Sequence, residues 1–123
     1  MQAAKRILLI DDDDDVREVL SRFLQEHGYE VSTATCGDEA LASMMEDPPD
    51  LALLDLSMPG LSGLDVMRWM KEQHIDVPII AISGHPAASM IGPDSLRLGA
   101  EDFISKPFDL AVVGKKLEER LGA

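Results

Sequence analysis

Residues 7–12 read Ile-Leu-Leu-Ile-Asp-Asp, a solid apolar run followed at once by two carboxylates. A run this short is typical of a β-strand buried on both faces, because a buried helix needs a longer one. Two later segments share the pattern, with Leu-Ala-Leu-Leu-Asp at residues 51–55 and Ile-Ile-Ala-Ile-Ser at residues 79–83. We therefore expect three central strands that each end in a polar side chain.

Helical patterns separate these runs. Apolar residues recur at helical spacing over residues 16–24, 40–45, 64–70 and 110–121, with Gly28 and Pro48-Pro49 as stops and Asp109 as a candidate N-cap. Residues 30–35 and 102–105 alternate apolar and polar side chains, which is typical of edge strands. The order of elements predicts an α/β fold, a doubly wound (βα)5 flavodoxin-like parallel sheet of five strands in the order 2-1-3-4-5.

The composition narrows the class of protein. With 123 residues the chain fits one domain, which we place at residues 1–123 with no output domain in the chain. The net charge of −12 argues against direct nucleic-acid binding, which needs a basic surface. No apolar run approaches the roughly 20 residues of a membrane span, and the single Cys36 cannot form an internal disulfide. These features indicate a cytoplasmic protein without a membrane partner.

Polar side chains should meet at one edge of the sheet, because the carboxyl ends of parallel strands lie together and ligands bind at the switch point there. The residues at these ends are Asp11, Asp12, Asp55, Ser83 and Lys106. Three nearby carboxylates repel one another, and a bound cation relieves this repulsion. Because all of the ligands are oxygens, Mg²⁺ (or Mn²⁺) is the expected cation. A carboxylate beside such an ion can attack a phosphoryl group to give an acyl phosphate, with Lys106 and Ser83 binding the phosphoryl oxygens.

Together these motifs resemble the receiver domains of two-component response regulators of the chemotaxis-regulator type. The resemblance covers essentially the whole chain and rests on Asp11-Asp12, Leu-Leu-Asp-Leu-Ser-Met-Pro-Gly at residues 53–60, Ser83, and Lys-Pro-Phe at residues 106–108. It implies that Asp55 is the phosphoacceptor and that Lys106 and Ser83 contact the phosphoryl group. The implied metal ligands are Asp11, Asp12, Asp55 and the backbone carbonyl of Ser57. Ser83 and Phe103 would form the switch, and the Lys106–Pro107 bond would be cis.

The resemblance also implies a signalling role. A sensor histidine kinase or a phosphotransfer protein would donate the phosphoryl group to Asp55, which would shift the domain between two conformations. A downstream protein, or an output domain missing from this chain, would respond before hydrolysis resets the switch. Such a domain catalyses its own phosphorylation and dephosphorylation, but it is not an enzyme acting on a separate substrate.

Three other functions compete with this interpretation. Asp12, Asp14 and Val16 also fit the spacing of a haloacid dehalogenase phosphohydrolase, with Asp12 as nucleophile and Asp14 as acid/base, although Asp55 would then be unexplained. A calcium-binding EF-hand is rejected, because counting from Asp11 puts Val16 and Arg22 where the loop needs Gly and Glu. A receiver that serves only as an unphosphorylated scaffold remains an alternative.

Several residues have plainer interpretations. Asp13, Asp14 and Asp15 suit the first turn of a helix, where each carboxylate is worth about 0.3–1 kcal/mol. Cys36 is expected in an edge strand, the methionines at helical spacing in the core, and Trp69 partly exposed.

One segment departs from the family pattern. Gly92-Pro93 interrupts the place of the usual fourth helix, so we expect this helix to start late, near Pro93, after a mobile loop over residues 84–92. His85 lies two residues after Ser83 and is a candidate for tuning dephosphorylation.

Overall fold

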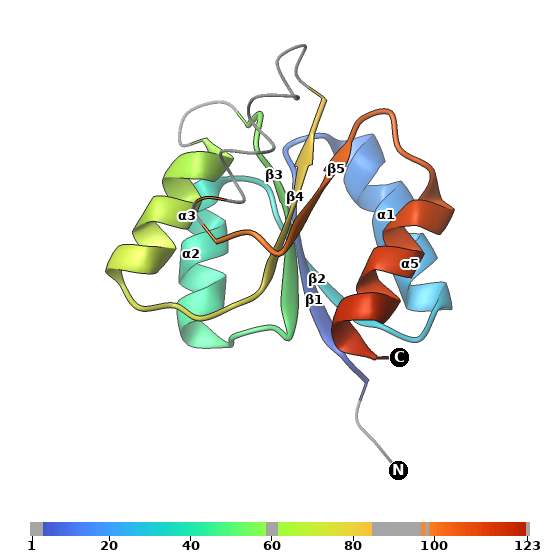
Figure 1. Ribbon diagram of the computed structural model, residues 1–123, viewed down its shortest axis with the longest axis horizontal. Coiled ribbons are helices and arrows are strands. Elements are labelled where there is room, and N and C mark those ends of the chain that lie inside the picture. The colour runs from blue at the N-terminus through green and yellow to red at the C-terminus, as the bar shows by residue number, and fades with distance from the viewer. Residues whose placement is uncertain (1–3, 59–61, 85–96, 98, 123) are drawn as a thin grey trace.

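A single parallel sheet organises the chain in this computed structural model, which describes residues 4–58, 62–84, 97 and 99–122 (Figure 1). Its strands run in the order β2-β1-β3-β4-β5, as the sequence predicts. The strands are β1 (Arg6–Ile10), β2 (Glu30–Ala34), β3 (Leu51–Asp55), β4 (Ile79–Ser83) and β5 (Asp102–Ser105). The three solid apolar runs are the three inner strands, and the two alternating segments are the edges.

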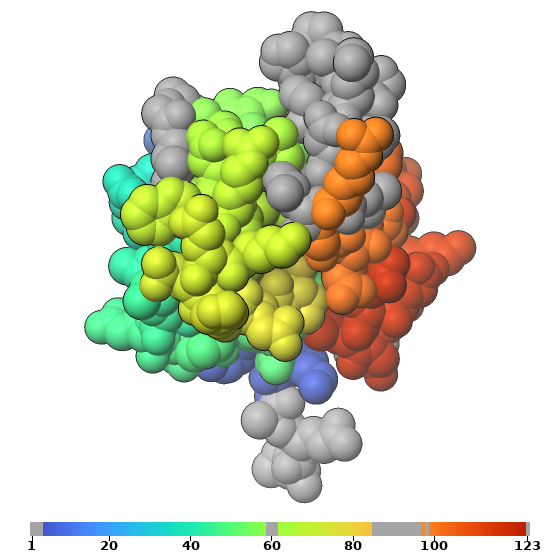
Figure 2. Space-filling model, turned by 60° about the vertical axis from the view of Figure 1, so that its left-hand side comes forward, coloured from blue at the N-terminus to red at the C-terminus, as the bar shows by residue number. Residues whose placement is uncertain are grey.

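Helices cover both faces of this sheet. The helices of the described residues are α1 (Asp14–Glu26), α2 (Gly37–Glu46), α3 (Gly63–Glu72) and α5 (Leu110–Leu121). Helices α1 and α5 lie on one face, and α2 and α3 lie on the other (Figure 1). Figure 2 shows that the side chains of α2 and α3 form the outer surface on their side of the molecule.

The buried core is therefore divided into two layers by the sheet. On β1, Leu8 and Ile10 pack in the layer beneath α2 and α3, whereas Ile7 and Leu9 pack in the layer beneath α1 and α5. All four side chains are fully buried, because successive residues of a strand point to opposite faces and both faces are covered. This is why residues 7–10 of β1 are all apolar.

Aspartate side chains cap the N-termini of α1 and α5, as predicted for Asp109, whereas Asp13 was expected within the first turn of its helix and is instead the N-cap. The Asp13 side chain caps α1 by accepting hydrogen bonds from the amides of Asp15 and Val16, and Asp14 and Asp15 lie in the first turn. The Asp109 side chain likewise caps α5. Gly28, which follows α1, has φ +88°, a backbone conformation that glycine adopts without strain. The acidic run thus forms the short loop after β1 and the first residues of α1.

Several details differ from expectation. Cys36 is not in the edge strand, because β2 ends at Ala34 and Cys36 is the N-cap residue of α2. Val19 and Met45 are exposed, because their helices bury only the face turned toward the sheet, whereas Trp69 is partly exposed as predicted.

The predicted late start of the fourth helix and His85 fall within residues 85–96, outside the described residues. No helix of the described segments is long and apolar enough to cross a membrane.

Gly63, the first residue of α3, lies against the backbone at the end of β3. An added Cβ there would lie 2.6 Å from Leu56 Cα and 2.7 Å from the Asp55 carbonyl oxygen, so the backbone would have to move. We expect Gly63→Ala to lower the free energy of unfolding by about 1–3 kcal/mol, as overpacking does. Urea denaturation would measure this loss.

Gly114→Ala is a suitable comparison, because its added carbon would meet only the end of the Phe23 ring, at 3.3 Å. A ring can shift by a few tenths of an ångström more easily than two backbone segments can. The change at Gly114 should therefore be the smaller one. A Gly63→Ala variant as stable as the wild type would contradict the close approach.

Candidate functional site

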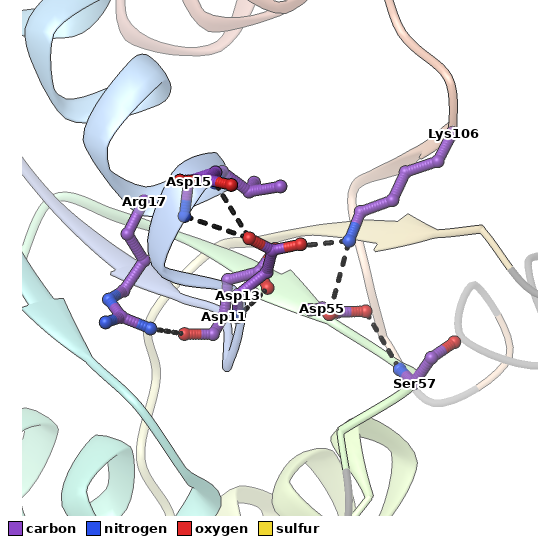
Figure 3. A network of polar contacts seen from close by, with 8 residues as sticks. Asp11, Asp13, Asp15, Arg17, Asp55, Ser57 and Lys106 are labelled. Atoms are coloured by element: carbon purple, nitrogen blue, oxygen red, sulfur yellow. Dashed lines mark hydrogen bonds and ion pairs between the residues drawn. The ribbon is translucent and has the colours of Figure 1, made fainter.

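Polar residues from four strands meet at the carboxyl edge of the sheet, as the topology requires. Asp11 directly follows β1, Asp55 ends β3, Ser83 ends β4 and Lys106 directly follows β5. The Lys106 ammonium lies 3.3 Å from Asp11 Oδ2 and 3.4 Å from Asp55 Oδ2 (Figure 3). Asp11 and Asp55 lie 95 and 51 residues before Lys106 in the sequence, and in the fold they share its ammonium group.

Asp11 is buried and held at several of its polar atoms. It is 0% exposed, and its amide donates to the Ala34 carbonyl at 3.2 Å. Its Oδ1 accepts a hydrogen bond from the Asp13 amide at 2.9 Å, while Oδ2 faces Lys106. Burial raises the pKa of Asp11, and the nearby charge of Asp55 raises it further, although the Asp13 amide and Lys106 act in the opposite direction. The site thus concentrates negative charge that favours a cation.

Asp55 is similarly fixed at the end of the central strand. It is 2% exposed, and its Oδ1 accepts a hydrogen bond from the Ser57 amide at 2.9 Å. The following amide, of Leu56, donates to the Ile82 carbonyl at 2.8 Å, which ties this end of β3 to β4. The carboxylate therefore has a defined orientation, with one oxygen toward Ser57 and the other toward Lys106 (Figure 3).

Lys106 is positioned through both its backbone and its side chain. Its amide donates to the Ser83 carbonyl at 2.8 Å, and its bond to Pro107 is cis. Burial alone would lower the pKa of Lys106, but the carboxylates of Asp55 and Asp11 outweigh burial and raise it. The side chain is thus a permanent cation at neutral pH, placed between two buried carboxylates.

The cluster has the ligand set that a divalent cation needs. Asp11, Asp12 and Asp55 each offer a carboxylate oxygen, and these three atoms lie within 4.8 Å of one another. Asp12 is exposed, whereas the other two are buried, so the cluster opens toward solvent on one side. Such an all-oxygen set, with one ligand residue exposed to solvent, fits Mg²⁺ better than a nitrogen- or sulfur-preferring metal.

The other predicted residues are outside this cluster, on β4, β5 and α1. Ser83 is buried at the end of β4, next to the strand end that carries Asp55. Phe103 lies in β5, is partly buried and packs against the core layer beneath α2 and α3. Asp14, the acid/base of the competing hydrolase interpretation, is not in the cluster and pairs instead with Arg17.

Arg17 is a residue near the site to which the sequence interpretation gave no role. Its Nη1 donates to the backbone carbonyl of Asp11 at 2.7 Å (Figure 3). Its Nη2 pairs with the Asp14 carboxylate. The sequence does contain a signal for half of this arrangement, because residues three apart on a helix are neighbours. The contact with Asp11 depends on how α1 leaves the sheet and has no sequence signature.

Residues 7–118 match the family described as "Response regulator receiver domain". Response regulator SaeR from Staphylococcus epidermidis is 37% identical over 105 residues, which cover 83% of this chain and 44% of that protein. Transcriptional regulatory protein PrrA from Mycobacterium tuberculosis is 41% identical over 108 residues, covering 86% of this chain and 45% of that protein. The chain thus spans less than half the length of these curated relatives.

Solved structures of receiver domains are also similar to this chain. The receiver domain of NtrX from Brucella abortus has a TM-score of 0.87 and 35% identity, covering 95% of this chain and 98% of that one. The signal receiver domain of a putative Luxo repressor protein from Vibrio parahaemolyticus has a TM-score of 0.89 at 24% identity, with coverage of 97% and 91%. The second likeness, at its low identity, shows the fold alone.

Proposed function

This chain belongs to the response regulator receiver domain family, and from that membership we propose that it is a phosphoacceptor switch with Asp55 as the acceptor. The observation that carries the proposal is the placement of the Lys106 ammonium within 3.4 Å of the carboxylates of both Asp11 and Asp55. A cation held beside a buried nucleophile provides a place for the negative charge of a phosphoryl group. The competing hydrolase function lacks such support, because Asp14 is paired elsewhere.

The proposed transfer begins with an Asp55 oxygen attacking the phosphorus of a phosphohistidine on the donor. A phosphorus–oxygen bond forms, the phosphorus–nitrogen bond breaks, and the imidazole leaves with a proton from solvent. Lys106 and Ser83 would hold the phosphoryl oxygens, Lys106 as a point charge and Ser83 as a hydrogen-bond donor. Hydrolysis returns the domain to its starting state when water attacks the phosphorus and the Asp55 carboxylate leaves.

The carboxylates of Asp11, Asp12 and Asp55 and the backbone carbonyl of Ser57 would hold the Mg²⁺ (or Mn²⁺). When bound, the ion supplies charge neutralisation between the attacking carboxylate and the phosphoryl oxygens. The protein contributes the orientation of these ligands, since Asp11 Oδ1 and Asp55 Oδ1 are each fixed by a backbone amide at 2.9 Å. The remaining oxygen of each carboxylate faces Lys106.

We propose that phosphorylation is read through Ser83 and Phe103. Ser83 lies in β4, beside the acceptor strand β3, and Phe103 lies in β5, three residues before Lys106. Phe103 has no hydroxyl group, so its response would depend on packing rather than on a new hydrogen bond. The partners would be a sensor histidine kinase or phosphotransfer protein, and a downstream protein or an output domain in a longer polypeptide. We place the domain in the cytoplasm and, at a net charge of −12, away from direct contact with nucleic acid.

Metal dependence tests the proposal directly. Incubation with phosphoramidate or acetyl phosphate should give one phosphoryl adduct in intact-mass spectra when Mg²⁺ is present. Removing the metal with EDTA should abolish the adduct, because the clustered carboxylates then repel the incoming phosphoryl group. Restoring Mg²⁺ should restore it.

Rapid hydrolysis would also hide an adduct, so a second measurement is needed. Beryllofluoride, which mimics an acyl phosphate and does not hydrolyse in this way, should bind in the presence of Mg²⁺ and be detected by fluorine NMR. Failure of both the adduct and beryllofluoride binding would overturn the phosphoryl switch. The scaffold interpretation would then be the one that remains.

A further inference from the structure

Arg17 stands out among the charged residues of α1 because its side chain is largely buried. Only 17% of that side chain is exposed, compared with 71% for Arg22, five residues further along the helix. Arg22 makes an ordinary surface pair with Glu18. Burying a guanidinium costs free energy unless its donors are satisfied, so the contacts of Arg17 need an explanation.

These contacts lead back to the acidic loop. Side chains of a helix point toward its N-terminus, so a residue in the second turn of α1 can reach the loop that precedes it. Arg17 uses this geometry twice, donating to the Asp11 carbonyl at 2.7 Å and pairing with Asp14. A guanidinium presents two nitrogens in a rigid planar fork, one for each of these contacts, whereas a lysine ammonium presents a single nitrogen on a flexible stem.

The Asp11 backbone is consequently held on both sides. Its amide is bonded to Ala34 of β2, and its carbonyl is bonded to Arg17 of α1. The next residue, Asp12, has an exposed side chain that must keep its place in the cluster with Asp11 and Asp55. A fixed Asp11 carbonyl restricts the peptide unit that leads directly into Asp12.

We propose that Arg17 is a positioning residue for the metal site, fixing the peptide between Asp11 and Asp12 so that both carboxylates stay directed at the ion. This inference rests on the proposed function, because it assumes that the Asp11, Asp12 and Asp55 cluster binds Mg²⁺. Arg17 does not touch the ion or the phosphoryl group. It acts through the loop, as outer residues around metal sites commonly do.

Two roles of Arg17 predict opposite results. If only its charge mattered, replacing it by Gln would remove a positive charge near the cluster and tighten Mg²⁺ binding. If it positions the loop, Arg17→Gln should weaken Mg²⁺ binding by about 10-fold, the lower end of the effect for outer residues around metal sites. Arg17→Lys should also weaken binding, because it keeps the charge but loses the fork.

The experiment is a calorimetric titration of the whole chain with Mg²⁺ alone. It compares the wild type with Arg17→Gln, Arg17→Lys and the matched control Arg22→Gln, which removes the same charge from the exposed side of the same helix. Weaker binding in both Arg17 variants, with Arg22→Gln within twofold of the wild type, is the expected result. Tighter or unchanged binding in Arg17→Gln, or wild-type binding in Arg17→Lys, would overturn the proposal.

A second measurement needs no metal. Backbone amide order parameters from NMR relaxation should fall at Asp12 and Asp13 in the Arg17 variants and stay unchanged in Arg22→Gln. Thermal unfolding would confirm that each variant is folded. If the wild type bound no Mg²⁺, the metal site itself would be overturned, and the order parameters would show separately whether Arg17 holds the loop.

Discussion

Replacement of Asp55 by Asn is expected to abolish the Mg²⁺-dependent phosphoryl adduct. An amide is not a nucleophile toward phosphorus, whereas the shape of the side chain and its hydrogen bond with the Ser57 amide are retained. The variant should remain folded, because it removes one of two buried carboxylates whose mutual repulsion contributes to raising the pKa of Asp11. Intact-mass spectra after treatment with phosphoramidate would measure the loss, and thermal unfolding would confirm the fold.

Two further variants sharpen this result. Asp76→Asn makes the same chemical change at an exposed position in the loop before β4 and should leave the adduct at the wild-type level. Asp12→Asn removes a proposed metal ligand but keeps the acceptor, so it should require more Mg²⁺ for the same rate. An adduct that survives in Asp55→Asn and disappears in Asp12→Asn would instead identify Asp12 as the nucleophile, as in the haloacid dehalogenase arrangement.

The central strands could be predicted from the sequence because parallel strands covered on both faces have no room for polar side chains. Residues 7–10, 51–54 and 79–82 are apolar throughout, and each is buried in the sheet. Once these strands are recognised, the topology alone brings their carboxyl ends together. The meeting of Asp11, Asp55 and Lys106 was therefore predictable, although the sharing of one ammonium by two carboxylates was not.

What the sequence did not reveal depends on the distances between elements. No pattern in the sequence marks Gly63 as a point of close contact. Only the structure shows that a Cβ added there would lie 2.7 Å from the carbonyl oxygen of Asp55, at the end of β3. The contact of Arg17 with the Asp11 carbonyl likewise depends on the direction of α1. The apolar periodicity of a helix also overestimates what is buried. Val19 and Met45 belong to the apolar stripes of their helices but lie outside the face that the sheet covers, and both are exposed.

Replacement of Lys106 by Met is the second change with a large expected effect. It removes the cation next to Asp55 while keeping much of the length of the side chain. Loss of one group that stabilises transition-state charge in such a site lowers rates by about 10²–10³-fold, and we expect phosphorylation by phosphoramidate to slow by that order. A time course of adduct formation by intact mass would measure the rate.

The same replacement should not weaken Mg²⁺ binding. The Lys106 ammonium lies 3.3 Å from Asp11 and 3.4 Å from Asp55, so in the metal-free protein it neutralises part of the charge that attracts the ion. Its removal should therefore leave Mg²⁺ affinity unchanged or higher while phosphorylation slows. Lys106→Arg, which keeps the charge in a different shape, should be intermediate in rate. Phosphorylation of Lys106→Met at the wild-type rate would contradict a phosphoryl contact, and a slow rate with weakened Mg²⁺ binding would mean that Lys106 acts by organising the carboxylates.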